Sequence, residues 1–297
     1  MTGARRAGLV LVMNTTRSSI RLHERRGALF ALFAVGFAAA CGSARATHTD
    51  IDASDAFVVI GDPESTSGAT WTYRGTVDGV RYDLAGVLMK PTGAGPFPAV
   101  VLSHGSDGSA AFFTSAIGPT MRQWGLVCIA TNYTHASGVP LGAPGDASQP
   151  GASEANVLRA HMTHELLRRL AYVDMTRVAV HGHSMGAYLD VAAIAAHPND
   201  FLVGSQTGGG VRPDFIIAGP APTPTQARGA RIPYQMHHGD ADDVVPLSYD
   251  QRLDSVLATT GDPHELYVYA GADHLAVRLS PVMLGRVHDW YGAHGMF

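Results

Sequence analysis

One serine stands between two glycines where an apolar segment meets an alanine-rich one. Residues 177–183 (RVAVHGH) have the continuous apolar pattern of a strand buried on both faces, and the alanine-rich run follows directly. At such a strand-to-helix corner, the Gly-x-Ser-x-Gly motif at residues 182–186 exposes the Ser184 hydroxyl as a nucleophile at the positive end of a helix. Gly182 and Gly186 are then required because strand and helix pass too close for larger side chains. The alternative is a tight turn without chemistry.

Asp242 offers the carboxylate that such a serine needs. It follows the predicted strand at residues 232–239, in the segment GDADDVVP, where Asp240 and Asp243 are the competing acids. A strand-end Gly-x-x-Asp followed by Val-Val-Pro favours Asp242, and we expect the other two to be solvated turn residues. The sequence lacks the Asp-x-Asp-x-Asp-Gly pattern and distal Glu of a calcium loop.

His274 is the candidate base, in the segment YAGADHLAV after the last predicted strand. The chain has 15 histidines, and most are expected to be structural or exposed. His264 begins that last strand, so it lies at the opposite end of the sheet. His237 and His238 close another strand and are expected to support the site.

The three candidates follow the chain order Ser–Asp–His, which is typical of a nucleophile on an open α/β sheet. In this arrangement Ser184 attacks a carbonyl carbon. His274 takes the serine proton and later delivers it to the leaving group. Asp242 fixes the imidazole tautomer and stabilises its charged form.

Two backbone N–H groups are expected to bind the oxyanion that forms on the attacked carbonyl. One is the N–H of Met185, the residue after the nucleophile. The other belongs to the loop at residues 103–108 (SHGSDG), after the first buried parallel strand, where Ser106 is preferred to Asp107. The alternative for this loop is a plain tight turn.

No metal or other cofactor is expected. His181 and His183 point to the same side of their strand, as a metal-binding pair would. No carboxylate or cysteine ligand pattern accompanies them, so packing or hydrogen bonding is the preferred role for both.

Apolar strands and amphipathic helices alternate along the rest of the chain, which predicts a mostly parallel eight-stranded sheet with helices on both faces. An N-terminal antiparallel hairpin is predicted at Asp78-Gly79, a strong turn signal. The predicted strands are residues 70–77, 81–91, 97–105, 126–133, 177–183, 214–219, 232–239 and 265–271. The predicted helices are residues 112–125, 154–173, the alanine-rich run after Ser184, 248–261 and 280–295.

The segments outside these elements set the domain organisation. Residues 47–69 are polar and expected to be irregular, and residues 70–297 form one domain. The Gly/Pro/Ser-rich loop Thr134–Ser153 is long enough to be functional or mobile. The gap between the strands at 214–219 and 232–239 is too short for a separate cap domain.

The N-terminal segment 1–46 is typical of an export signal. Arg21, Arg25 and Arg26 precede an uncharged stretch at residues 27–41 that is too short for a comfortable membrane span. The alternative is an N-terminal helix that packs on the fold. An export signal predicts a secreted, periplasmic or cell-surface protein.

Two exits from this segment remain open. SARA, which ends at Ala46, fits cleavage by a signal peptidase, and FAAAC resembles a bacterial lipoprotein box with Cys41 as the lipidated residue. The long basic start also allows Met13 as the true first residue. A lipid anchor at Cys41 is the only membrane attachment expected.

The net charge excludes some partners. Residues 1–46 hold seven Arg and one Glu, so their removal changes the net charge from −4 to −10. An acidic protein is a poor binder of nucleic acid and of anionic membranes. Without Cys41, the remaining Cys128 has no intramolecular partner, so no internal disulfide is expected. The oligomeric state is left open.

These motifs together resemble the α/β-hydrolase superfamily, and within it the dienelactone-hydrolase-like and prolyl-oligopeptidase-like serine esterases. The matching segments are PAVVLSHGSDG, VDMTRVAVHGHSMGAY, HHGDADDVVP and GADHLAV, within residues 71–297. GHSMGA also resembles the nucleophile corner of secreted polyester hydrolases and acyl-glycerol lipases. Dienelactone hydrolases themselves use a cysteine nucleophile where this chain has Ser184, which argues against dienelactone as the substrate.

The resemblance implies a serine hydrolase that cleaves carboxylic esters, with a small-molecule or polymeric ester as substrate. One alternative is a peptidase or acyltransferase with the same triad, although the chain has no room for the propeller domain of prolyl oligopeptidases. Another is a non-catalytic surface lipoprotein with a hydrolase fold.

Overall fold

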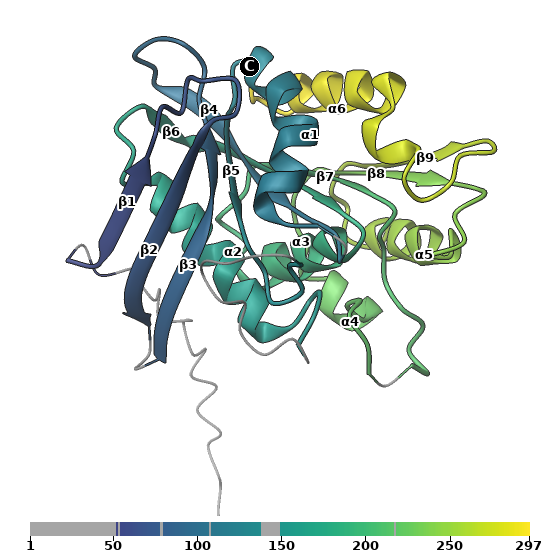
Figure 1. The fold of residues 1–297 in the computed structure, drawn as a ribbon. Coiled ribbons are helices and arrows are strands. Elements are labelled where there is room, and N and C mark those ends of the chain that lie inside the picture. Colours follow the sequence, from purple (N-terminus) through teal and green to yellow (C-terminus); the bar gives the residue numbers. More distant parts are fainter. Residues whose placement is uncertain (1–51, 53, 78–79, 107, 138–148, 217) are drawn as a thin grey trace, which may run out of the picture. The chain divides into compact units, whose positions relative to one another are not determined.

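A nine-stranded sheet forms the centre of the fold (Figure 1). The computed structural model describes residues 52, 54–77, 80–106, 108–137, 149–216 and 218–297. The strands lie in the order β1-β2-β3-β5-β4-β6-β7-β8-β9. They are β1 (Ala56–Ile60), β2 (Ala69–Val77), β3 (Val80–Met89), β4 (Phe97–Ser103), β5 (Val127–Thr131), β6 (Val173–His183), β7 (Val203–Thr207), β8 (Tyr234–Gly239) and β9 (His264–Tyr269).

The sheet has an antiparallel part and a parallel part. β1, β2, β3 and β5 pair antiparallel. The strands from β5 through β4 to β9 pair in parallel. The predicted mostly parallel sheet with an N-terminal antiparallel hairpin is therefore confirmed. Val77 pairs with Val80 across that hairpin, and the Asp78-Gly79 turn itself lies outside the described residues.

Residue patterns explain where each strand lies. Every residue of β5 is buried, as in a strand covered on both faces, whereas buried and exposed residues alternate along β2. Helices cover both faces of the parallel part (Figure 1). α1 (Ala110–Gln123) and α6 (Pro281–Ala293) pack on one face. α2 (Glu154–Leu167), α3 (Met185–Ala196) and α5 (Ser248–Leu257) pack on the other.

The remaining helical elements are short. α4 spans Pro224–Ala227, and one turn of 3-10 helix, η1, spans Val277–Leu279. Among the helices of the described residues, none has the length and apolar character needed to cross a membrane.

Two predicted segments differ from the structure. The strand predicted at residues 214–219 is wrong, because the described residues of that segment form turns and bends and the Phe215 side chain is 82% exposed. The strand at this position of the sheet is β7, whose residues are all buried. The segment 47–69, expected to be irregular, contains β1, so the sheet has nine strands instead of eight.

Two connections lie near the carboxyl ends of the parallel strands. In its described part, the connection from β7 to β8 holds only the four-residue helix α4. Residues 138–148 of the predicted Thr134–Ser153 loop lie outside the described residues. The two ends of that loop meet at Asn156, which accepts a hydrogen bond from the Thr134 N–H and donates one to the Gly151 carbonyl.

The predictions for the N-terminal segment 1–46 concern residues whose structure is not described. Residues 1–51 lie outside the described residues, so the export signal and the lipidation of Cys41 stay predictions. Cys128, in β5, is buried and carries a free thiol.

The strand register brings the candidate residues to one edge. Ser103 pairs with Gly182, and His183 pairs with Thr207. The chain leaves β4 on one side for β5 and returns on the other side for β6, so the order of strands reverses beside β4. Ligands of open α/β sheets bind beyond the carboxyl ends of the strands at such a reversal.

His181 gives the fold a measurable dependence on acid. It lies fully buried in β6, its Nδ1 stands 2.7 Å from the Ser205 Oγ, and burial lowers its pKa to about 3. The imidazole is therefore neutral in the folded protein, whereas the unfolded chain binds a proton there below about pH 6.5. Its contribution to stability is complete above that pH and is lost as the pH falls toward 3.

We expect His181→Asn to flatten this dependence. Between about pH 6 and pH 4, the unfolding free energy of the variant should fall about 1.4 kcal/mol less per pH unit than that of the wild type. Urea unfolding at a series of pH values measures the slope. Ser205→Ala, which keeps the imidazole but removes its partner, should retain the wild-type slope. A His181→Asn slope equal to that of the wild type would contradict the neutral imidazole.

Candidate active site

Ser184 occupies the corner between β6 and α3 in a strained conformation. Its φ is 56° and its ψ is −118°, and among the described residues it is the only non-glycine with a positive φ. Such a conformation costs about 1–3 kcal/mol, and surrounding contacts must hold it. The Ser184 N–H donates to the Thr207 carbonyl at 3.0 Å, and the Ser184 carbonyl accepts from the Tyr188 N–H at 3.2 Å.

The two glycines of the motif permit a close approach of backbone. A Cβ on Gly186 would stand 2.0 Å from the Ser103 carbonyl oxygen. A Cβ on Gly182 would stand 2.3 Å from the Asp190 Oδ2 and 2.6 Å from the Gly186 carbonyl carbon. The predicted reason for these glycines is confirmed: β4, β6 and α3 meet too tightly for any side chain.

Asp242 and His274 come together as the sequence predicts. The His274 Nδ1 lies 2.7 Å from the Asp242 Oδ2, and the two side chains are only 9% and 1% exposed. The other carboxylate oxygen, Oδ1, accepts hydrogen bonds from the N–H groups of Val244 and Val245 at 2.9 and 2.8 Å. This carboxylate is fixed on both oxygens, so it holds the imidazole in one orientation.

The two competing acids, Asp240 and Asp243, have different surroundings. Asp240 accepts a hydrogen bond from the Gly271 N–H at 2.6 Å, which ties the loops after β8 and β9 together. Asp243 is exposed. His264, the first residue of β9, lies at the far end of its strand. Of the residues considered as acid and base, Asp242 and His274 form the shortest contact, at 2.7 Å.

His274 lies over the serine corner. Its ring centroid is 4.7 Å from that of His183, the residue before Ser184. A Cβ on Gly208, which follows the carbonyl that binds Ser184, would stand 3.0 Å from the His274 ring. The serine corner and the Asp242–His274 pair therefore share one edge of the sheet.

His183 supports the His274 ring without charge. Its Nδ1 lies 2.9 Å from the Thr207 Oγ1, and it is 1% exposed. Burial, reinforced by the neighbouring His274, holds the pKa of His183 well below its usual value. A neutral imidazole can pack against His274 without opposing a positive charge there. His181 and His183 thus bond to Ser205 and Thr207, the packing and hydrogen-bonding roles preferred for them.

The loop after β4 touches the serine. A Cβ on Gly105 would stand 3.2 Å from the Ser184 Cβ. His104 fastens this loop: its Nε2 accepts a hydrogen bond from the Tyr133 N–H at 3.2 Å, so its Nδ1–H donates to the Gly105 carbonyl at 2.8 Å. Burial lowers the pKa of His104 to about 3, which keeps this tautomer neutral. Ser106 follows on the loop, and Asp107 lies outside the described residues.

Met185 is the first residue of α3. The N–H groups of a first helical turn have no partner inside the helix, so they are available to an anion.

Two buried carboxyl groups behind the site were missed in the sequence. Asp250, on α5, lies 2.7 Å through its Oδ2 from the His238 Nδ1, and the His238 Nε2 lies 3.3 Å from the Asp242 Oδ2. Burial alone would lower the pKa of His238, but its hydrogen bond to Asp250 and the charges of Asp250 and Asp242 outweigh burial and raise it. His238 thus supports Asp242, whereas the His237 side chain bonds to Gln235 and Tyr269.

Asp190 is the second missed group. It lies fully buried in α3 beneath the corner, and its Oδ1 accepts a hydrogen bond from the Ser103 Oγ at 2.6 Å. Burial raises the pKa of Asp190 well above its usual value. In the sequence, each of these groups is simply an aspartate within a helical segment. Nothing there distinguishes it from an aspartate on the surface.

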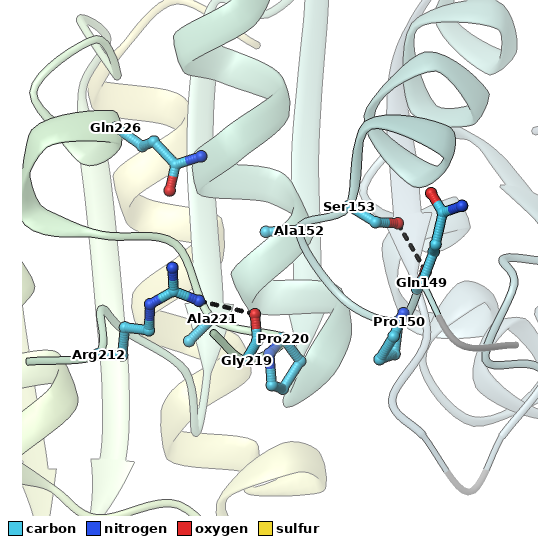
Figure 2. Close-up of a pocket in the computed structure, with 9 residues that line it drawn as sticks. All are labelled: Gln149, Pro150, Ala152, Ser153, Arg212, Gly219, Pro220, Ala221 and Gln226. Carbon is cyan, nitrogen blue, oxygen red and sulfur yellow. Dashed lines mark hydrogen bonds between the residues drawn. The ribbon is translucent and has the colours of Figure 1, made fainter. Parts of the chain in front are cut away.

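A cavity opens beside the helix that follows the serine (Figure 2). It has a volume of about 380 Å³ and lies between the segment that enters α2 and the β7–β8 connection. Ala152 and Ala221 on its wall pack with Met185 and Tyr188 of α3. Arg212 donates a hydrogen bond to the Gly219 carbonyl at 2.8 Å. The lining residues are Gln149, Pro150, Ala152, Ser153, Arg212, Gly219, Pro220, Ala221 and Gln226, and none is a predicted site residue.

The sheet, its helices and a serine at the sharp corner after β6 define the α/β-hydrolase fold. Within that fold, the chain belongs to the dienelactone hydrolase family, whose sequence profile matches residues 84–279. In the described part of the chain the one cysteine is Cys128, and burial raises its pKa to about 12. A buried thiol held in the protonated form is not a nucleophile, so Cys128 does not replace the cysteine of dienelactone hydrolases.

Solved structures of other hydrolases share the fold. An S-formylglutathione hydrolase from Agrobacterium tumefaciens superposes with a TM-score of 0.60 at 17% identity, over 80% of this chain and 99% of that one. An esterase from Thermogutta terrifontis gives 0.57 at 15% identity, over 74% and 92%. The acylaminoacyl peptidase of Pyrococcus horikoshii gives 0.60 at 17% identity, over 75% of this chain but only 41% of that one. No curated protein matches the sequence.

We expect Gly186→Ala to disrupt the corner, because its new Cβ would press into the Ser103 carbonyl. The variant should lose about 2 kcal/mol or more of unfolding free energy, measured by urea denaturation. Gly285→Ala is the matched control in α6, where an added Cβ meets nothing within 4 Å. It should gain about 0.5–1 kcal/mol from helix propensity. Equal effects of the two substitutions would show that the corner is not close-packed.

Proposed function

We propose that this member of the family is a serine hydrolase that cleaves carboxylic esters through an acyl-enzyme intermediate. The proposal is carried by the 2.7 Å hydrogen bond between His274 and Asp242 at the edge of the sheet where Ser184 lies strained at its corner. Serine, imidazole and carboxylate in this order are the parts that acyl transfer requires.

The roles follow from the atoms that are already occupied. The Nδ1 of His274 is bound to Asp242, so its Nε2 is the nitrogen that accepts the Ser184 proton and later returns it to the leaving alcohol. The Asp242 carboxylate keeps that tautomer and offsets the positive charge on the imidazolium. Water then attacks the acyl group on Ser184 with His274 as the base, and the serine is regenerated.

The oxyanion would be bound by two backbone N–H groups. Met185 supplies one from the first turn of α3, where the helix dipole also favours negative charge. Ser106 supplies the other, on the loop that His104 fastens against Ser184. Each donor of this kind contributes about 3–4 kcal/mol to transition-state stabilisation.

Small or accessible esters suit the surroundings of the site. The described part of the β7–β8 connection holds no helix longer than α4, so nothing there has the size of a cap. The cavity of about 380 Å³ beside α3 could accept the acyl or the alcohol group, with Arg212 on its wall. The solved structures that share the fold include an S-formylglutathione hydrolase and an esterase. If the predicted export signal operates, the enzyme meets its substrate outside the cytoplasm.

The nucleophile is tested by a panel of p-nitrophenyl esters of increasing acyl length. Ser184→Ala should lower kcat at least about 10³-fold. It should also abolish labelling by a fluorophosphonate probe. Ser255→Ala, an exposed serine on α5, is the matched control and should change neither readout. A wild-type protein that hydrolyses no ester in the panel would refute the proposal, and faster turnover of matched amides would indicate a peptidase.

The oxyanion donor on the β4 loop is tested by Ser106→Pro, which removes the N–H. We expect kcat to fall about 10²–10³-fold. Ser106→Ala keeps the N–H and should lose less than about threefold. Circular dichroism controls for loss of the fold. Similar losses in both variants would mean that the side chain, or the loop as a whole, acts instead of the backbone donor.

A further inference from the structure

A second cluster of ionisable side chains lies at the end of α3 that is remote from Ser184. His161, His164 and Glu165 come from α2, and Asp200 comes from the connection between α3 and β7. All four residues are buried, and one potential ligand atom of each lies within 4.8 Å of the other three. Since α3 has 12 residues, a length of about 18 Å, the cluster is separate from the serine corner.

The four side chains come from two places that the fold brings together. His161, His164 and Glu165 stand at spacings of three and four residues, so they share one face of α2. Asp200 follows the turn at the end of α3, where its N–H donates to the His197 carbonyl at 3.1 Å. The cluster therefore links one helix to the end of another.

The contacts inside the cluster have the scale of a metal coordination shell. The His161 Nδ1 lies 2.7 Å from the Asp200 Oδ2, and the His164 Nδ1 lies 3.7 Å from the Asp200 Oδ1. The His164 Nδ1 also lies 3.1 Å from a Glu165 carboxylate oxygen. Four ligands around a zinc ion, at bond lengths of 2.0–2.2 Å, stand roughly 3.3–3.6 Å apart. Of the three contacts in the cluster, two are shorter than this separation between ligands and one is longer.

The charge balance within the cluster favours a bound cation. Arg168 donates through its Nε to both oxygens of Glu165, at 3.0 and 2.9 Å, and balances that carboxylate. Within the described part of the chain, only the imidazoles of His161 and His164 lie at ion-pair distance from Asp200. A buried carboxylate needs a positive partner, which is either a proton on one imidazole or a metal ion. One proton serves one nitrogen–oxygen contact, whereas a metal ion would satisfy four converging ligand atoms.

We propose that His161, His164, Glu165 and Asp200 bind one zinc ion. Two imidazole nitrogens favour a transition metal over calcium or magnesium, which prefer oxygen ligands. The surroundings fit a closed structural site. Arg168 orients the Glu165 carboxylate from outside, and the His197 ring stacks on the His161 ring at a centroid distance of 3.9 Å. The ion ties α2 to the start of β7, so its effect is on stability, and the proposal is independent of the ester-hydrolase proposal.

The test uses the untagged full-length protein, because a histidine tag would bind zinc itself. Protein from zinc-supplemented cells, desalted and measured by plasma emission spectrometry, should carry about one zinc per chain. Removal of the zinc by a chelator should lower the Tm by about 5 °C or more, and added zinc should restore it. Cobalt in place of zinc should give the visible absorption of a four-coordinate site.

Variants locate the ion. Asp200→Asn and His164→Gln should each reduce the bound zinc at least about tenfold. His264→Asn, at the start of β9, is the control and should keep the zinc content of the wild type. If the site variants fail to fold, zinc and cobalt binding to the chelator-treated wild type decides the question. Wild-type protein without zinc, whose Tm neither metal raises, would overturn the proposal and leave a proton-bridged cluster.

Discussion

The close approach of β4, β6 and α3 at two glycines is the constraint on which the site depends. There the chain turns from strand to helix within one residue, Ser184, which takes a positive φ. The strained conformation is held by the hydrogen bond from the Ser184 N–H to the Thr207 carbonyl and by the one that the Ser184 carbonyl accepts from the Tyr188 N–H. A serine in an ordinary turn would lack the free N–H groups that the start of a helix provides.

Buried polar groups make this corner rigid. Beneath it, Ser103 donates to Asp190, whose pKa burial holds well above its usual value. Beside it, His238 stands between the carboxylates of Asp250 and Asp242. In a low-dielectric interior such fixed partners interact strongly, and a missing partner is costly. The site is thus held by a second layer of polar contacts, from β4, α3, β8 and α5.

The sequence was sufficient for the parts of the site that are local. Each predicted site residue follows an apolar strand, and parallel strands bring their carboxyl ends to one edge, so Asp242 and His274 could be paired before their contact was known. The choice among three neighbouring acids rested on a short motif, and the geometry agrees with it. The oxyanion donors were placed by the same logic, because they are backbone groups at fixed steps from a strand end.

The sequence does not predict β7, because the residues that bond its polar side chains are distant in the chain. β7 has the residues VGSQT, whose polar side chains argue against a buried strand. They are satisfied from elsewhere in the fold: Ser205 by His181 and Tyr291, and Gln206 by Asp250 and Tyr234. The apolar segment at 214–219 looked more like a strand than β7 did. Its exposure shows that hydrophobicity alone does not decide which segment enters a sheet.

The same limit explains why the sequence does not predict the cluster at the far end of α3. His161, His164 and Glu165 are neighbours on one helix, but Asp200 lies 35 residues beyond Glu165 and joins them only through the packing of α2 on α3. Asp200 also leads into β7, and the last residue of β7, Thr207, carries the carbonyl that holds the Ser184 N–H. A cation at Asp200 would therefore lie just before the strand whose last residue bonds the serine corner, without taking part in the chemistry.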